Sequence, residues 1–268
     1  MLDVIVGQAT DPGKLRASNE DAMAAFIPKS PQEARSHGWM CVIADGVGGL
    51  DLGDVASSRA VAVMVKGFSC APAGTLLSSL LQHLVQEANA AVHDEGLQPQ
   101  RRGKQMATTV VSCALRYDKA VVAHVGDSRC YHLRDNKILA VTDDHTFVSE
   151  QLRMGLITPI EAASSEIRNI LTRSLGPERF VEANVVTLRI APGDTLLLCT
   201  DGLHGGMYEQ DILDLVSQMS SPQQTAEKLV NYAIEVDGSD NATAQVIQIR
   251  DVESATEYRK RPFRIPGL

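Results

Sequence analysis

The stretch TTVVSCALRYDKAVVAHVGDSRCYHLRDNK, residues 108–137, contains three apolar runs separated by short polar segments. Thr108–Arg116, Ala120–Val125 and Cys130–Leu133 are rich in Val, Ala, Leu and Cys, a composition that favours buried strands. The break Tyr117-Asp118-Lys119 predicts a hairpin between the first two runs. Arg134-Asp135-Asn136-Lys137 predicts a second hairpin, so this part of the chain is expected to form antiparallel sheet.

Outward from this stretch, six more runs of similar composition are bounded by Gly, Asp, Asn or Pro, the residues at which strands usually end. These predicted strands are Asp3–Gln8, Met23–Ile27, Met40–Ala44, Val185–Ile190, Thr195–Cys199 and Ala244–Ile249.

Four segments predict helices. In Thr75–Ala91 the leucines recur every three or four residues and form a one-sided stripe. Asp54–Lys66 follows a glycine-rich loop, and Asp211–Met219 is a third candidate. The fourth runs to about Ile234 and opens with Ser221-Pro222-Gln223-Gln224. This opening combines an N-cap Ser, Pro at the first helical position and Gln three residues after the cap.

The order of elements is strands, two helices, further strands, a helical insert, two strands, two helices and a last strand. Antiparallel hairpins beside paired helices predict an α+β fold in which two stacked sheets are covered by helices. We expect residues 1–250 to form one domain, although length alone also allows two. Residues 251–268 carry four basic residues and two prolines and predict a poorly ordered basic tail.

The formal net charge of -8 argues against a nucleic-acid role, because a phosphate backbone requires a basic face. The five cysteines include no C-x-x-C pair and predict buried free thiols in a reducing compartment. The first residues show no basic segment followed by a long apolar run, and no stretch is apolar enough to cross a bilayer. We therefore expect a cytoplasmic protein without a membrane or nucleic-acid partner.

Four aspartates stand at predicted strand ends: Asp45 in VIADGVGG, Asp127 in AHVGDSR, Asp201 in LLCTDGL and Asp240 in GSDNAT. A single Asp-Gly is most simply a turn, but several converging carboxylates need a cation to offset their repulsion. An all-oxygen ligand set suits Mg²⁺ or Mn²⁺ and does not suit zinc. Sequence spacing alone does not establish that the four aspartates meet.

These residues belong to an ordered set of motifs that resembles the metal-dependent protein phosphatases, the type 2C Ser/Thr phosphatases. The resemblance extends to about Arg250; each motif is weak alone, but their order is specific. The compact size and the insert TPIEAASSEIRN are similar to the bacterial branch. The motifs are RASNEDA at Arg16–Ala22, VIADGVGG at Val42–Gly49, GDVAS at Gly53–Ser57, TT at Thr108–Thr109, VGDSR at Val125–Arg129, DDH at Asp143–His145, LTRSLG at Leu171–Gly176, TDGL at Thr200–Leu203 and DNAT at Asp240–Thr243.

The resemblance implies a single catalytic domain with a four-layer α-β-β-α sandwich, in which two antiparallel sheets are flanked by helix pairs. It implies that Asp45 bridges two metal ions and that the Gly46 carbonyl binds one of them. Asp201 and Asp240 would complete the other ion's ligands, and Glu20 would hold metal-bound water in the outer shell.

The same resemblance implies a third, weaker metal site at Asp127 and Asp201. Arg16 would bind the substrate phosphate, and Asp21 and Asn241 would support the site.

The implied reaction is hydrolysis of phosphoserine and phosphothreonine on proteins by a hydroxide held between two Mn²⁺ or Mg²⁺ ions. Its catalytic residues would be Arg16, Asp45 and Asp201, without a covalent enzyme intermediate. The implied partners are phosphoproteins and a cognate Ser/Thr kinase, and we expect a monomer that acts in signalling.

The chain departs from the family pattern at two positions. Val47 stands where many eukaryotic members have a His that is proposed to protonate the leaving group, so a metal-bound water is the first candidate for the acid. His145 and His204 are weaker candidates and fit structural roles better. Gly205 stands where the family usually has a second Asp, and this departure weakens the third metal site most. Phe147–Arg168 aligns with the flap that shapes substrate access.

Other interpretations have less support. Gly46-Val47-Gly48-Gly49 is only a near match to a dinucleotide loop, and the chain has no Walker pattern and no G-x-S-x-G elbow. Two alternatives stay open: a non-catalytic relative that binds metal or phosphoproteins, and a phosphatase that acts on a small metabolite.

Overall fold

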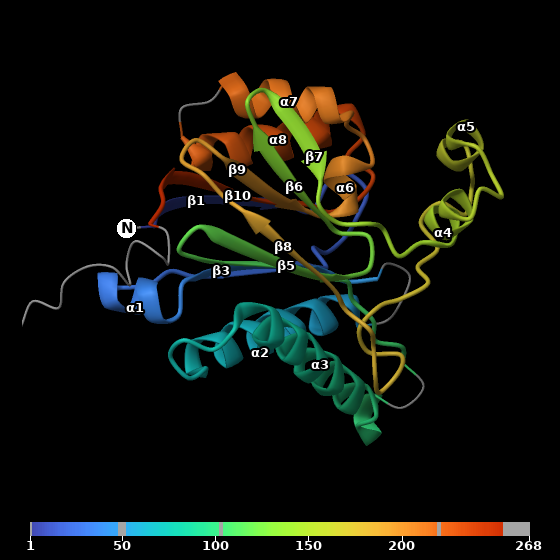
Figure 1. Ribbon diagram of the computed structural model, residues 1–268. Helices are drawn as coiled ribbons and strands as arrows, with labels where there is room; N and C mark the ends of the chain where they lie inside the picture. Colours follow the sequence, from blue (N-terminus) through green and yellow to red (C-terminus); the bar gives the residue numbers. More distant parts are fainter. Residues whose placement is uncertain (1, 48–51, 102–103, 219–220, 254–268) are drawn as a thin grey trace, which may run out of the picture.

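The computed structural model describes residues 2–47, 52–101, 104–218 and 221–253. Two five-stranded antiparallel sheets are stacked on each other, with helix pairs on both outer faces (Figure 1). This architecture confirms the expected α+β fold and its four α-β-β-α layers. From residue 254 the predicted tail lies outside the described residues, as do Gly48 and Gly49, and the division into domain and tail stays a prediction.

The two sheets have the strand orders β1-β10-β9-β6-β7 and β2-β3-β4-β5-β8, and all neighbouring strands are antiparallel. The first sheet contains β1 (Asp3–Asp11), β10 (Ala242–Asp251), β9 (Thr195–Cys199), β6 (Arg129–Arg134) and β7 (Lys137–Ala140). The second contains β2 (Asp21–Phe26), β3 (Trp39–Asp45), β4 (Val110–Arg116), β5 (Lys119–Val125) and β8 (Asn184–Arg189). Every predicted run is therefore a strand.

Four long helices form the outer layers (Figure 1). The second sheet is covered by α2 (Gly53–Cys70) and α3 (Leu77–Gly96), and the first by α7 (Glu209–Gln218) and α8 (Pro222–Val236). The shorter elements are α1 (Pro31–Ser36), a 3₁₀ turn at Pro99–Arg101, α4 (Phe147–Arg153), α5 (Pro159–Ala163) and α6 (Asp201–His204). None of the helices in the described ranges is both long enough and apolar enough to span a bilayer.

Strand β3 shows how sequence alternation builds the layers. Met40 and Val42 pack in the apolar cluster under α2 and α3, whereas Cys41 and Ile43 pack in the cluster between the sheets. Successive side chains of a strand point to opposite faces, and both faces are covered here, so the whole run is apolar. A third cluster, which includes Leu197, joins the first sheet to α7 and α8.

Both predicted hairpins form. Arg116 pairs with Lys119 across the turn that contains Tyr117, whose φ is 59°. Arg134 pairs with Lys137, and the two turn residues Asp135 and Asn136 have φ values of 50° and 56°. Two consecutive left-handed residues are typical of the type I′ turn, whose twist matches that of the flanking strands.

Some local expectations differ from the structure. Ser221 occupies the N-cap position of α8, but its side chain makes no capping hydrogen bond. Instead, the Thr225 hydroxyl donates to the Ser221 carbonyl at 2.9 Å. The short helices α1 and α6 were not predicted, because so few residues carry too little periodicity. All five cysteines are free, but Cys70, at the end of α2, is exposed while the other four are buried.

Asp194, just before β9, is a buried carboxylate that is 1% exposed. It accepts hydrogen bonds from Arg134 Nε at 2.6 Å and from the Ala191 N–H at 2.9 Å. Burial raises the pKa of Asp194, but hydrogen bonds from Arg134, Ala191 and His132 outweigh it and leave this pKa below its ordinary value. Such a carboxylate contributes stability above the unfolded pKa of about 3.9, and the contribution is lost as pH falls through the folded pKa.

Asp194→Asn is expected to lower the free energy of unfolding by about 2 kcal/mol near neutral pH, because the amide loses the charge-assisted hydrogen bonds. The difference from the native chain should shrink as the pH falls below about 4. Urea unfolding followed by circular dichroism across this pH range measures both effects. Asp214→Asn, on the exposed face of α7, is the control. A stability difference that is independent of pH would contradict this role for Asp194.

Candidate active site

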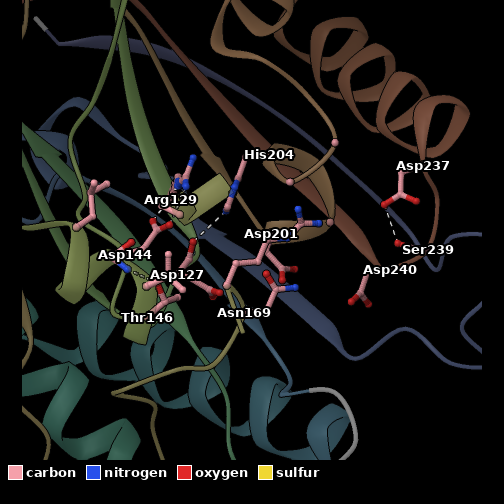
Figure 2. Close-up of a pocket in the computed structure, with 18 of the residues that line it drawn as sticks. Asp127, Arg129, Asp144, Thr146, Asn169, Asp201, His204, Asp237, Ser239 and Asp240 are labelled. Atoms are coloured by element: carbon pink, nitrogen blue, oxygen red, sulfur yellow. Dashed lines mark hydrogen bonds and ion pairs between the residues drawn. The ribbon is translucent and has the colours of Figure 1, made fainter. Parts of the chain in front are cut away.

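The strand-end aspartates come together in the folded chain. Asp45 ends β3, Asp127 lies between β5 and β6, Asp201 begins α6 directly after β9, and Asp240 precedes β10. The carboxyl groups of Asp45 and Asp201 lie close enough to perturb each other's pKa. Asp127, Asp201 and Asp240 line one cavity, as Figure 2 shows. The fold therefore gathers carboxylates that are far apart in the sequence.

Their proximity perturbs the acidity of the whole group. Burial raises the pKa of Asp45 well above its ordinary value, and the charges of Asp21, Asp201 and Asp127 add to the effect. Burial, followed by the charge of Asp201, raises the pKa of Asp127 to about 8. Burial also raises the pKa of Asp21 to about 7, although two hydroxyl hydrogen bonds oppose it. Carboxylates this close repel one another unless a cation neutralises them.

The residues present fit a divalent metal ion by charge and donor type. The groups that meet are carboxylates, and Asp21 Oδ1 is buried without a hydrogen-bond partner in the described part of the chain. Within those same ranges, no three acidic, His or Cys side chains already surround one point as a ligand set. Oxygen donors of this kind suit Mg²⁺ or Mn²⁺.

Asp21, expected only to support the site, joins the two sheets. It stands directly opposite Asp45 in the β2–β3 ladder. Its Oδ2 accepts hydrogen bonds from the hydroxyls of Thr243 at 2.6 Å and Thr200 at 2.9 Å. Thr243 lies in β10 and Thr200 directly follows β9, so both hydroxyls come from the other sheet. Asp21 thereby helps to set the position of Asp45 relative to Asp201.

The backbone at Asp45 is held by two threonines and a glycine. The Asp45 N–H donates to Thr109 Oγ1 at 3.0 Å, and the Thr108 hydroxyl donates to the Asp45 carbonyl at 2.7 Å. A Cβ on Gly46 would lie 2.5 Å from the backbone of Gly53, so this close approach to α2 requires glycine. The TT motif was quoted above without a role; in the structure these two hydroxyls position Asp45.

Arg16 lies on the loop between β1 and β2, and its guanidinium donates to Asp240 Oδ2 at 2.6 Å. The two side chains are 38% and 34% exposed, so the pair is accessible from solvent. The hydrogen bond with Asp240 raises the pKa of Arg16 above its ordinary value. The site therefore has a permanent cation at its edge, beside one of the candidate metal ligands.

Asn241 holds the loop that carries Arg16. Its amide donates to the carbonyls of Pro12 at 2.8 Å and Ser18 at 3.0 Å. Its Oδ1 accepts a hydrogen bond from the Glu20 N–H at 2.8 Å, and the Glu20 carbonyl accepts one from the Gly46 N–H at 3.1 Å. Burial raises the pKa of Glu20, and the charge of Arg16 opposes the rise. Asn241 thus connects the start of β10 to both the Arg16 loop and the end of β3.

A cavity of about 450 Å³ opens beside the carboxylates. Sequence reasoning assigned no role to Arg129, Asp144 or Asn169, which line it, although the first two stand in the VGDSR and DDH motifs. Arg129 donates to both Asp144 oxygens, at 2.8 Å and 2.7 Å, and so neutralises that wall. Figure 2 shows Asp127, Arg129, Asp144 and Thr146 on one side of the view and Asp237, Ser239 and Asp240 on the other, with Asp201 and Asn169 between them.

The candidate proton donors make backbone contacts. His204 Nε2 donates to the Asp127 carbonyl at 3.0 Å, and burial lowers the pKa of His204 to about 4. His145 Nδ1 accepts a hydrogen bond from the Gly126 N–H at 3.1 Å, and burial lowers its pKa to about 3. These contacts support the structural roles expected for both histidines. Val47 cannot donate a proton from its side chain.

Comparison with known proteins agrees with the motif order. The protein phosphatase 2C family model matches residues 16–234. Serine/threonine phosphatase stp of Listeria welshimeri is 32% identical over 242 residues, which cover 89% of this chain and 93% of the relative. The crystal structure of the Mycobacterium tuberculosis serine/threonine phosphatase PstP/Ppp has a TM-score of 0.82 and 30% identity, covering 93% of this chain and 100% of that one.

A second solved structure, the PstP catalytic domain in complex with two manganese ions, has a TM-score of 0.80 and 30% identity. The match covers 94% of this chain and 100% of the PstP chain in that structure. The family match runs from Arg16 to Ile234 and so includes Asp45, Asp127 and Asp201. The chain therefore belongs to the protein phosphatase 2C family and is a protein serine/threonine phosphatase.

Proposed function

We propose that this phosphatase removes phosphate from phosphoserine and phosphothreonine with the help of two divalent cations bound at the aspartate cluster. The observation that carries the proposal is the group of mutually repelling buried carboxylates beside Arg16. Asp45, the Gly46 carbonyl, Asp201 and Asp240 would hold the two cations. A relative whose structure contains two manganese ions supports this assignment.

Asp127, together with Asp201, is the candidate for a third and weaker cation site. Bound cations would lower the pKa of a water molecule and offset charge on the phosphoryl oxygens. Because Gly205 supplies no carboxylate, this third site would have fewer ligands than its usual form in the family.

The chain's own groups orient the substrate. The Arg16 guanidinium can bind two phosphoryl oxygens through its fork, and Asp240 holds it in place before substrate arrives. Asn241 fixes the loop on which Arg16 stands. Neither Val47 nor His204, whose Nε2 donates to a backbone carbonyl, is placed to give a proton to the leaving oxygen. We therefore assign protonation of the leaving alkoxide to a water molecule.

The substrates would be phosphoproteins modified by a cognate Ser/Thr kinase, since the similar proteins are named serine/threonine phosphatases. Mn²⁺ and Mg²⁺ both suit the ligands, and the relative with bound manganese favours Mn²⁺.

The test is hydrolysis of a phosphothreonine peptide by purified protein with Mn²⁺, with Mg²⁺ and with a chelator. Turnover is expected to require a divalent cation and to fall by at least about 10³-fold when the chelator removes it. Adding the cation back should restore the rate.

Turnover that a chelator leaves unchanged would contradict the metal assignment. Folded, metal-loaded protein with no turnover would point to a binding module instead of an enzyme. Faster hydrolysis of a sugar phosphate than of the phosphopeptide would contradict the proposed substrate class.

A further inference from the structure

The segment between β7 and β8 contains two short helices, α4 and α5, that stand away from the sandwich (Figure 1). Thr146 caps α4 through its side chain, and Thr158 forms a capping box with Glu161 on α5. At the base of the segment, the Phe147 N–H donates to the Ile170 carbonyl at 2.9 Å. Hydrogen bonds at their ends therefore stabilise these two helices, and their apolar side chains are available to contact another molecule.

Exposed apolar side chains are concentrated in this segment. Of the sixteen exposed large apolar residues among the described positions, seven lie within residues 147–170. Ile160 is 82% exposed, and Met154 and Leu156 are each 67% exposed. A clustered apolar surface of this kind marks an interaction site more often than scattered apolar residues do. The seven residues are Phe147, Leu152, Met154, Leu156, Ile160, Ile167 and Ile170.

The same segment forms one wall of the cavity, in which four apolar side chains lie beside Ser149, Arg168 and Asn169. Val148, Leu152, Pro159 and Ala162 line it from α4 and α5. Leu152 belongs both to this wall and to the exposed set, with 38% exposure. The facing side of the cavity carries three aspartates: Asp201, Asp237 and Asp240.

We infer that residues 147–170 form a peptide wall that receives an apolar side chain lying close to the phosphorylated residue of the substrate. The inference rests on the proposed function, which places the phosphoryl group beside Arg16 and Asp201. Flanking residues of the peptide then enter the cavity between the aspartates and the wall. An apolar side chain there removes its own surface and that of Leu152 from water. The substrate class is therefore phosphoproteins with an apolar residue beside the phosphoserine or phosphothreonine.

A charged residue on the same segment gives the competing interpretation. Arg168 lines the cavity and would favour an acidic side chain in the substrate. The peptide wall around Leu152 favours an apolar one. The two interpretations predict different peptide preferences, so one experiment separates them.

The experiment measures kcat/KM with Mn²⁺ for phosphothreonine peptides that carry Leu, Ser or Glu at each flanking position in turn. Leu is expected to exceed Ser by about tenfold in at least one position, as burial of one aliphatic side chain implies. Leu152→Asn is expected to bring this ratio close to one. Leu97→Asn, at a 70% exposed leucine at the C-terminal end of α3, is the matched control and should keep the ratio. A general loss of folding would lower kcat/KM for the Leu and Ser peptides by the same factor and leave their ratio unchanged.

A second variant covers the case in which Leu152→Asn does not fold. Ala162→Glu places a carboxylate on the peptide wall from α5 and is expected to shift the preference from the Leu peptide to one carrying Lys. Equal rates for the Leu and Ser peptides with the native chain would overturn the inference. A preference for Glu would also overturn it and would assign selection to Arg168.

Two further measurements separate this inference from the proposed function and from self-association of the chain. Turnover of p-nitrophenyl phosphate by the native chain tests the proposed function, because this substrate has no flanking residues. If it is absent, fluorescence anisotropy of the same peptides still measures the Leu-to-Ser preference in binding. Sedimentation tests a second copy of the chain as the occupant of the wall. Self-association that Leu152→Asn abolishes, with an unchanged peptide ratio, would overturn the inference.

Discussion

Asp201→Asn is expected to lower kcat/KM on a phosphothreonine peptide by at least about 10³-fold, while the fold survives. The pKa of Asp201 is affected by both Asp45 and Asp240, so Asp201 stands at the centre of the carboxylate cluster. Asn has nearly the same shape but no charge to hold a cation. Steady-state kinetics and calorimetric Mn²⁺ titration measure the two consequences.

Stability provides the control for this variant. Burial raises the pKa of Asp201, which means that its ionised form costs stability at neutral pH in the cation-free protein. Asn removes that cost, so the Tm of the cation-free variant should be at least as high as that of the native chain. Turnover retained by the folded variant would contradict the two-cation assignment. A large drop in Tm would instead assign Asp201 a structural role.

Arg16→Ala is expected to lower kcat/KM on the same peptide by about 10²-fold, because one preorganised donor to the phosphoryl group is lost. Arg16→Lys should recover only part of the activity, since an ammonium keeps the charge but not the two-pronged geometry. Competitive inhibition by inorganic phosphate should weaken in parallel. The measurement compares kcat/KM, phosphate inhibition and Tm across the three proteins.

The effect on stability should be small, because the Arg16–Asp240 pair is partly exposed and such pairs contribute about 0–1 kcal/mol. Arg59→Ala removes another exposed ion pair, to Glu95 on α3, and is the matched control for charge loss away from the cavity. Unchanged kcat/KM for Arg16→Ala would rule out the phosphate-binding role.

Local features of the fold followed directly from neighbouring residues. The type I′ turn at Asp135-Asn136 needs two residues that tolerate positive φ, and the chain offers an Asp-Asn pair between two strands. The leucine stripe of α3 has helical spacing. The side-chain cap expected at Ser221 does not form, although the Thr225 hydroxyl donates to the Ser221 carbonyl from within α8.

The site was predictable only in part. The aspartates at strand ends could be named from composition and motif order, but Asp144, Arg129 and the two threonines at Asp45 could not be given roles. A hydroxyl or a surface ion pair has the same appearance in a sequence whether it faces solvent or a cavity. The peptide wall around Leu152 could not be predicted for the same reason, since the sequence does not distinguish an exposed leucine from a buried one.

The amino-acid sequence by itself determined most of the strands and the long helices, the two hairpin turns, and which residues carry carboxylates at strand ends. Backbone preferences and side-chain periodicity depend on residues that are close in the sequence, so they can be predicted from the sequence directly. Only the tertiary structure decided that Asp45 and Asp201 meet and that Asp21 connects the sheets. Those distances depend on strand order, register and the stacking of two sheets. Burial of three separate apolar clusters determines that stacking, and it involves residues from the whole length of the described chain.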